Sequence, residues 1–122
     1  MKRVIVCGSR DWDDPKPIAW TIAGMRERLG PITIVHGAAR GADNLAGVVC
    51  RKFGIPEEPH PADWIGKGRA AGPLRNQLML SLGADYVVAF KDGFDHSLES
   101  GGTENMIRIA READVPTMIV CH

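Results

Sequence analysis

The chain has 122 residues, of which 44% are hydrophobic, and its 15 basic and 15 acidic residues give a formal net charge of zero. This length fits a single domain over residues 1–122 that folds without metal or disulfide cross-links. The charge balance excludes a global attraction to nucleic acid, and the absence of an apolar run near about 20 residues excludes a membrane-spanning helix.

Strand and helix signals alternate along the chain, with glycine and proline at the boundaries. Asp14 followed by Pro15 is typical of an N-cap and the first residue of a helix. Residues 86–90 are continuously apolar, as in a strand buried on both faces, whereas two prolines place residues 55–60 at a sheet edge. Alternating strands and helices predict a parallel sheet with right-handed crossovers. In chain order, we predict a strand (2–7), a helix (15–29), a strand (32–36), a helix (42–53), a weak strand (55–60), a loop (61–72), a helix (73–82), a strand (86–90), a loop (91–102), a helix (103–113) and a strand (117–120).

Glycine-rich turns lie where three of these strands lead toward helices. Glycine lets backbone N–H groups approach a ligand closely, and helix N-termini favour anions. Because the carboxyl ends of parallel strands meet at one sheet edge, where ligands bind, the turns predict a phosphate or nucleotide site there. The alternative is that the glycines only permit positive φ between a strand and a helix. The glycines concerned are Gly8, Gly37, Gly41, Gly101 and Gly102.

Charged side chains near these turns each allow two interpretations. Arg40 contacts a phosphate or pairs with Asp43, and we favour the phosphate because a guanidinium binds phosphate oxygens in a bidentate manner. Asp43 is a candidate ligand residue at a position where an N-cap or a first-turn acid is expected, and capping is the favoured role. Arg75 lies near the positive end of a helix dipole, where a cation gains nothing structurally. That position indicates a role in ligand binding or catalysis.

Smaller polar residues complete the predicted site. Ser9 and Arg10 form part of a phosphate cage or of a simple β-turn, and Asn76 contacts the ligand or the backbone. Thr103 contacts the ligand or caps its helix, and Glu104 is a catalytic acid or a first-turn acid. Trp12 and Trp64 stack on a base or anchor their loops.

The cysteines and histidines indicate no metal and no disulfide framework. Cys7, Cys50 and Cys121 are odd in number and widely spaced, which suits buried, reduced thiols. The chain has no CxxC or HxxxH spacing, so we expect no metal or other cofactor. The N-terminus runs directly into a strand without signal-peptide features, and the expected location is therefore cytoplasmic.

The motifs together resemble a known superfamily. Val35 to Asp43, Gly72 to Met79 and Ser100 to Thr103 are similar to segments of the SLOG superfamily of Rossmann-like nucleotide-ligand proteins. The opening Gly8-Ser9-Arg10-Asp11-Trp12 resembles its small YspA-like branch. With this resemblance, we predict an α/β fold: a three-layer, Rossmann-like, doubly wound parallel sheet of about five strands in the order 3-2-1-4-5.

Relatives within this superfamily imply three functions. The favoured one is binding of a nucleotide-like ligand with Arg40 and Arg75. Arg75 and the Gly101-Gly102-Thr103 turn also resemble lonely-guy phosphoribohydrolases, which cleave an N-glycosidic bond of a nucleoside monophosphate; here Met106 replaces the carboxylate of their motif, and Glu104 is the nearest acid. The Ala39 to Asp43 turn is similar to the DNA-processing protein A family, which implies single-stranded DNA binding along Lys67, Arg69 and Arg75.

Apolar residues also remain uncovered on one outer helix. Leu78, Met79 and Leu82 lie there, which indicates a symmetric homodimer and agrees with the habit of the superfamily.

Overall fold

The computed structural model describes residues 1–91 and 101–121. Its strands are β1 (Lys2–Gly8), β2 (Ile32–His36), β3 (Glu57–Pro59), β4 (Tyr86–Lys91) and β5 (Thr117–Cys121). Its helices are α1 (Pro15–Leu29), α2 (Ala42–Phe53), α3 (Trp64–Lys67), the 3-10 helix η1 (Gly68–Ala70), α4 (Ala71–Ser81) and α5 (Gly101–Glu112).

All strand pairs are parallel, in the order β3-β2-β1-β4-β5, which confirms the predicted α/β topology. The chain runs outward from β1 to β3 and then returns to the other side of β1 with β4. The strand order therefore reverses between β1 and β4, and in doubly wound sheets ligands bind at the carboxyl ends of the strands at such a point.

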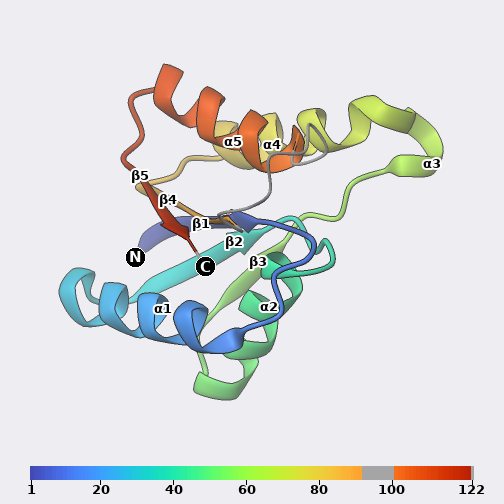
Figure 1. The fold of residues 1–122 in the computed structure, drawn as a ribbon. Helices are drawn as coiled ribbons and strands as arrows, with labels where there is room; N and C mark the ends of the chain where they lie inside the picture. Colours follow the sequence, from blue (N-terminus) through green and yellow to red (C-terminus); the bar gives the residue numbers. More distant parts are fainter. Residues whose placement is uncertain (92–100, 122) are drawn as a thin grey trace.

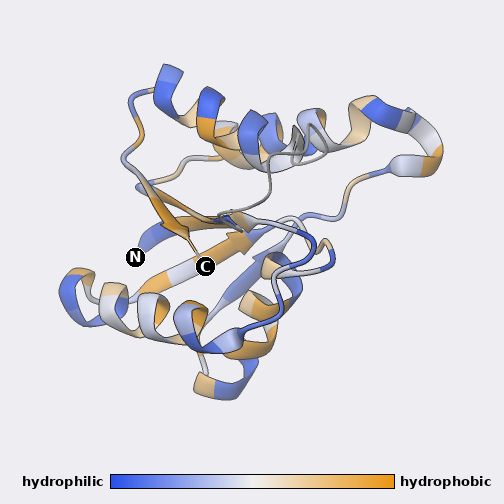
Figure 2. Ribbon diagram, viewed as in Figure 1, coloured by the Kyte–Doolittle hydropathy of each residue, from blue (hydrophilic) through white to orange (hydrophobic). Residues whose placement is uncertain are grey.

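Helices cover both faces of the sheet, with α1 and α2 on one side and α4 and α5 on the other (Figure 1). Alternation along β1 supplies both cores: Val4 and Val6 pack with α1 and α2, while Ile5 and Cys7 pack with α4 and α5. Figure 2 shows hydrophobic residues along most of the sheet, between helices that carry both hydrophilic and hydrophobic residues. Within the described chain, no helix has the length and apolar character required to cross a membrane.

Local signals account for most element boundaries. The Asp14 carboxylate accepts the Lys16 N–H at the start of α1, and Gly54 ends α2 in the left-handed conformation. β3 is an edge strand, as its prolines predict. The apolar residues Val87 to Phe90 of β4 are all buried, also as predicted.

The structure corrects four predicted elements. β3 covers only Glu57–Pro59 of the expected residues 55–60. The predicted loop over residues 61–72 contains α3, which Asp63 caps by accepting the Gly66 N–H at 2.9 Å, and η1. α4 begins at Ala71, before Pro73, because proline is tolerated anywhere in a first turn, where its missing N–H has no helical partner. α5 begins at Gly101, so Thr103 is inside the helix and is not its N-cap. Residues 92–100 of the last predicted loop lie outside the described chain.

The three cysteines are free thiols. Cys7 and Cys50 are buried, but Cys121 is exposed, so the expectation of burial was wrong for this residue. The reason is its place at the end of β5, an edge strand with a neighbour on one side only.

Candidate ligand-binding site

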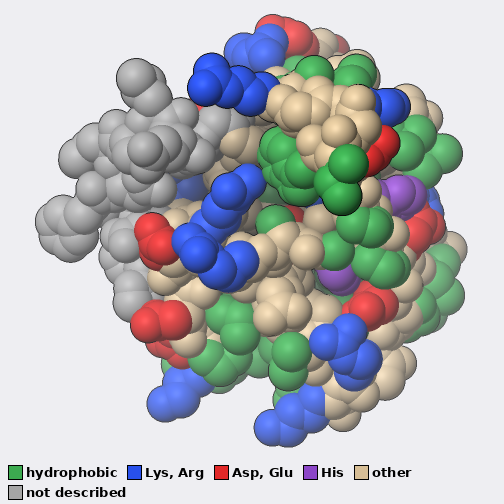
Figure 3. Space-filling view, turned by 90° about the vertical axis from the view of Figure 1, so that its right-hand side faces the viewer, with side chains coloured by type: hydrophobic (Ala, Val, Ile, Leu, Met, Phe, Trp, Pro, Cys, Tyr) green, Lys and Arg blue, Asp and Glu red, His purple; other side chains and the backbone are tan. Residues whose placement is uncertain are grey.

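A cavity of ≈ 1050 Å³ lies at the carboxyl end of β1, where the strand order reverses. Its walls come from the turns after β1 and β2, from α3 and α4, and from the first turns of α5. Figure 3 looks onto this side of the molecule, where Lys and Arg side chains lie around a hollow beside hydrophobic groups. The lining residues are Cys7, Gly8, Ser9, Arg10, Asp11, Ala39, Arg40, Asp43, Trp64, Arg69, Gly72, Pro73, Arg75, Asn76, Met79, Gly102, Thr103, Glu104, Asn105 and Arg108.

Most of the residues expected from the sequence share this cavity. They are Gly8, Ser9, Arg10, Arg40, Asp43, Arg75, Asn76, Gly102, Thr103 and Glu104. Gly37 and Gly41 lie behind the wall and shape it: a Cβ on Gly37 would collide with the Arg75 guanidinium, and Gly41 has φ +86° and packs against the backbone of Ser9 and Arg10. The surroundings of Gly101, the remaining predicted glycine, lie outside what the structure describes.

The turn after β1 is held mainly by its own backbone. The Ser9 N–H donates to the Phe90 carbonyl at 2.8 Å, and the Ser9 hydroxyl accepts the Asp11 N–H at 3.1 Å. The β-turn itself is closed by the backbone, because the Trp12 N–H donates to the Ser9 carbonyl at 3.3 Å, as the β-turn interpretation of Ser9 requires. Gly8 is needed beside it, because a Cβ there would collide with the Phe90 carbonyl and with Ala42.

Two lining arginines, Arg10 and Arg40, come from the turns after β1 and β2. The Arg10 guanidinium carbon lies 5.6 Å from the centre of the Trp64 ring, a cation–π contact that joins the β1 turn to α3. Arg40 is largely exposed and pairs with Asp11 at 3.4 Å, not with Asp43. An exposed pair of this kind adds little stability, so Arg40 can rearrange toward a ligand at small cost.

Asp43 is buried in the cavity floor and does not cap α2. Its Oδ2 accepts the Gly37 N–H at 3.2 Å and the Ala39 N–H at 3.4 Å, and it thereby closes the turn after β2. The favoured capping role was therefore wrong: no side chain caps α2, and the Ala42 N–H at its start donates to the Ser9 carbonyl. Burial raises the pKa of Asp43 to about 6, against the opposing effects of Arg75 and the two backbone donors.

Arg75 and Asn76 form a chain of hydrogen bonds across the cavity wall. Arg75 Nη1 donates to the Gly37 carbonyl at 2.7 Å, and Arg75 Nε donates to Asn76 Oδ1 at 2.9 Å. Asn76 Nδ2 then donates to the Gly102 carbonyl at 2.9 Å and to Asn105 Oδ1 at 3.1 Å. The chain joins the β2 turn, α4 and α5, so both residues have a structural role besides any contact with a ligand.

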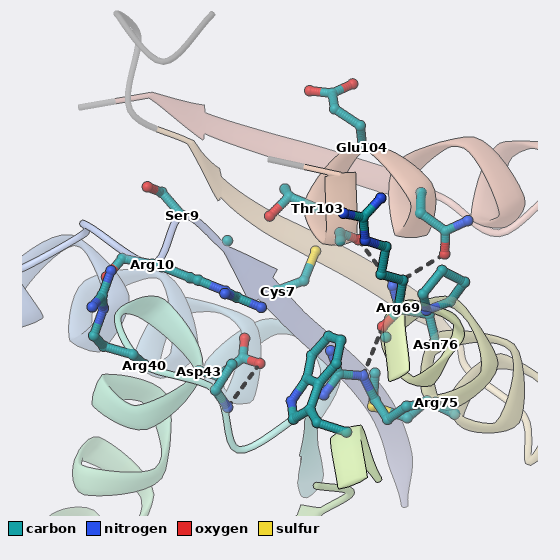
Figure 4. A pocket seen from close by; sticks show the side chains of 18 of the residues that line it. Cys7, Ser9, Arg10, Arg40, Asp43, Arg69, Arg75, Asn76, Thr103 and Glu104 are labelled. Carbon is teal, nitrogen blue, oxygen red and sulfur yellow. Dashed lines mark hydrogen bonds between the residues drawn. The ribbon is translucent and has the colours of Figure 1, made fainter. Parts of the chain in front are cut away.

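The start of α5 places Thr103 and Glu104 differently. Both residues line the cavity, but Thr103 is buried, whereas the exposed Glu104 carboxylate pairs with Lys91 and points away from Arg75 (Figure 4). Met106, at the position of the hydrolase carboxylate, is fully buried in the core between the sheet and the α4–α5 layer. The described site thus holds no carboxylate at the expected catalytic position.

Sequence reasoning did not assign Cys7, Gly72, Asn105 and Arg108 to the site. Cys7 alternates with its neighbours on β1 toward the α4–α5 side, and burial raises the pKa of its thiol, which stays protonated. Arg108 follows Glu104 by one helical turn, which brings both residues to the same side of α5. Arg108 could have been predicted only from knowledge of which face of α5 borders the cavity. The sequence pattern of one strand and one helix does not reveal that face.

Residues 2–65, more than half of the chain, match the model of the YspA, cpYpsA-related SLOG family. The chain belongs to this family. Gene 61 protein of Mycobacterium phage D29 is 37% identical to it over 125 residues, which cover 97% of this chain and 95% of the phage protein.

Two solved structures share the fold of this SLOG domain. DNA processing protein A of Streptococcus pneumoniae has a TM-score of 0.75 at 18% identity, over 98% of this chain and 50% of that one. DNA processing protein A of Helicobacter pylori, whose structure concerns its single-stranded DNA binding mode, has a TM-score of 0.61 at 18% identity, over 97% of this chain and 64% of that one. The SLOG domain therefore corresponds to only part of these larger proteins.

Proposed function

We propose that this SLOG domain binds a nucleotide in the cavity at the carboxyl end of β1. The observation that carries the proposal is the convergence of five arginines from separate elements on one cavity: Arg10, Arg40, Arg69, Arg75 and Arg108. The lining carboxylates are fewer, and two of them, Asp11 and Glu104, are already paired with Arg40 and Lys91. The cavity is therefore suited to an anionic ligand.

Two further features support a phosphate joined to an aromatic base. The first turn of α5 reaches the cavity at Gly102 and Thr103, and the first N–H groups of a helix attract phosphate. Trp64, which is 47% exposed, lines the same cavity and offers an aromatic surface. A volume of ≈ 1050 Å³ leaves room for a whole nucleotide.

Calorimetric titration with purine and pyrimidine mononucleotides, the matching nucleosides and inorganic phosphate tests the proposal. We expect the mononucleotides to bind more tightly than either part alone and to raise the melting temperature. In the described chain, the Arg10 side chain donates no hydrogen bond to the backbone. Arg10→Ala therefore removes a cation from the cavity lining without breaking such a bond, and it should weaken nucleotide binding at least about ten-fold. Arg111→Ala, on the exposed last turn of α5 outside the cavity, is the matched control. Equal affinities of the two variants would contradict the proposal.

Single-stranded DNA binding is the second candidate, and a specific observation favours it. Trp64, Lys67 and Arg69 are all exposed on the short helices α3 and η1 beside the cavity, and aromatic and cationic groups together bind single strands. Titration of an oligodeoxynucleotide at increasing salt separates the two candidates. A strand that binds more tightly than any mononucleotide, with an affinity that falls steeply with salt, would favour DNA.

Hydrolysis of an N-glycosidic bond has weaker support. The Glu104 carboxylate pairs with Lys91 and points away from Arg75, whereas general acid catalysis requires a carboxyl within hydrogen-bond reach of the leaving base. Incubation with nucleoside monophosphates should therefore release no free base. Base release lost in Glu104→Gln would restore the hydrolase interpretation.

We also propose that the domain forms a symmetric homodimer through the outer face of α4. Met79, which the sequence placed on this face, is buried in the core, so the expectation was wrong for this residue. Leu74 instead joins Leu78 and Leu82: the three follow one another at intervals of four residues and are each about half exposed.

A further inference from the structure

Asp43 carries a buried acceptor that nothing in the described chain satisfies. The residue is 6% exposed and lines the cavity. Its Oδ2 accepts two backbone N–H groups, but Oδ1 is buried and has no hydrogen-bond partner among the described residues. An unpaired buried acceptor is costly, so a native structure that retains one calls for an explanation.

The position of this atom separates it from the other unpaired buried groups. His36 Nε2 and Glu57 Oε2 also lack partners in the described chain, but they lie 4.0 Å from each other and line no part of the cavity. The imidazole nitrogen of His36 and the carboxylate oxygen of Glu57 are therefore polar neighbours of each other. Asp43 instead borders the space that a ligand would fill.

Two cations from different elements act on Asp43, namely Arg75 of α4 and Arg10 of the β1 turn. The Cys7 thiol of β1 lines the same cavity, and burial raises its pKa, so it is neutral. Figure 4 shows Asp43, Cys7 and Arg10 directed into the same space. Neither arginine forms an ion pair with Asp43 within 4 Å in the described structure. A ligand group that enters this space therefore meets one acceptor, Asp43 Oδ1, and two donor groups, the guanidinium groups of Arg10 and Arg75.

The chemistry of this space selects among the parts of a nucleotide. A phosphate oxygen would be repelled by the Asp43 carboxylate, and an exocyclic amine has only donors to offer to the arginines. A hydroxyl can donate to Asp43 Oδ1 and at the same time accept from a guanidinium. Acidic side chains bind ribose hydroxyls in the same way in other doubly wound sheets.

We infer that Asp43 Oδ1 accepts a hydrogen bond from a ribose hydroxyl of the bound nucleotide, so that the cavity selects against a nucleotide that lacks this hydroxyl. This inference rests on the proposed nucleotide binding and adds an orientation to it. The sugar lies over Asp43, and the phosphate lies toward the arginines at the cavity mouth and the start of α5.

Titrations of the wild-type protein with a ribonucleoside monophosphate and its 2′-deoxy and 3′-deoxy analogues test the inference without a mutation. We expect at least one deoxy analogue to bind about ten-fold more weakly, because a hydrogen bond to a charged acceptor is lost. Asp43→Asn keeps an oxygen for Gly37 and Ala39 but places an amide nitrogen where Oδ1 stood, so this preference should disappear. Asp13→Asn, an exposed aspartate outside the cavity lining, should retain it.

The outcomes distinguish this inference from the proposed function. Equal binding of all three nucleotides by the wild-type protein would overturn the role of Asp43 and leave nucleotide binding intact. A preference for ribose that survives in a folded Asp43→Asn protein would overturn it as well. Binding of none of the nucleotides would end both proposals.

Discussion

The Asp43 carboxyl links stability to pH. Burial raises the pKa of this carboxyl from about 4 in the unfolded chain to about 6 in the folded protein. At a pH between these two values, the folded protein therefore holds a proton that the unfolded chain has lost. The folded state binds more protons there, and the contribution of Asp43 to the free energy of unfolding therefore decreases as pH rises. A shift of roughly two pKa units corresponds to about 3 kcal/mol at neutral pH.

The Asp43→Asn variant lacks this titrating group. The free energies of unfolding of the variant and of the wild type should be measured by urea unfolding between about pH 4 and about pH 7. We expect the free energy of unfolding of the variant to rise relative to that of the wild type as pH increases, by up to about 3 kcal/mol over this range. Comparison of the two proteins at each pH cancels the other titrating groups. A difference that stays constant with pH would show that Asp43 titrates normally, and Asp13→Asn should give such a constant difference.

Between elements, the Asn76 side chain joins α4 to the start of α5. Its amide donates to the Gly102 carbonyl and to Asn105, and its oxygen accepts from Arg75. Asn76→Ala leaves these groups unpaired in a buried place, so it should lower the free energy of unfolding by about 1–3 kcal/mol. The exposed neighbour provides the control, because Gln77→Ala removes no hydrogen bond of the described chain. Equal urea midpoints for the two variants would contradict this role.

Elements with periodic or boundary signals were predictable from the sequence. Apolar runs indicated β1, β2, β4 and β5, and Asp14-Pro15 indicated the start of α1. β3 has no apolar run, and its prolines indicated its position at the sheet edge. α3 was missed because four residues are too few for a helical period. The start of α5 was misplaced because glycine disfavours helix interiors, although a first turn tolerates it.

The site was predictable where it follows from topology. Turns at the carboxyl ends of β1 and β2 had to meet, which placed Arg10, Arg40 and Asp43 together. The partner of each side chain was not predictable, since Arg40 pairs with Asp11 and the Asp43 carboxylate closes the β2 turn. Those choices depend on tertiary distances of a few ångströms that no sequence spacing encodes.

For the whole molecule, the two helical layers differ in what they expose. α4 presents Leu74, Leu78 and Leu82, which are 49%, 49% and 52% exposed, as a continuous apolar row. The opposite layer exposes Trp20 of α1, which is 70% exposed, and Val48 and Phe53 of α2, which are 45% and 54% exposed. A row at intervals of four along one helix is self-complementary about a two-fold axis, whereas apolar residues spread over two helices without that interval are an ordinary surface feature.

Sedimentation equilibrium of the wild type, Leu78→Glu and Trp20→Glu tests the dimer. We expect the wild type to sediment as a dimer and Leu78→Glu as a monomer, because a charge at the centre of the row would be buried without a partner in the interface. Trp20→Glu introduces the same charge in the other layer and should leave the dimer intact. A monomeric wild type, or a Leu78→Glu protein that still sediments as a dimer, would show that the α4 row is not an interface between two copies of the chain.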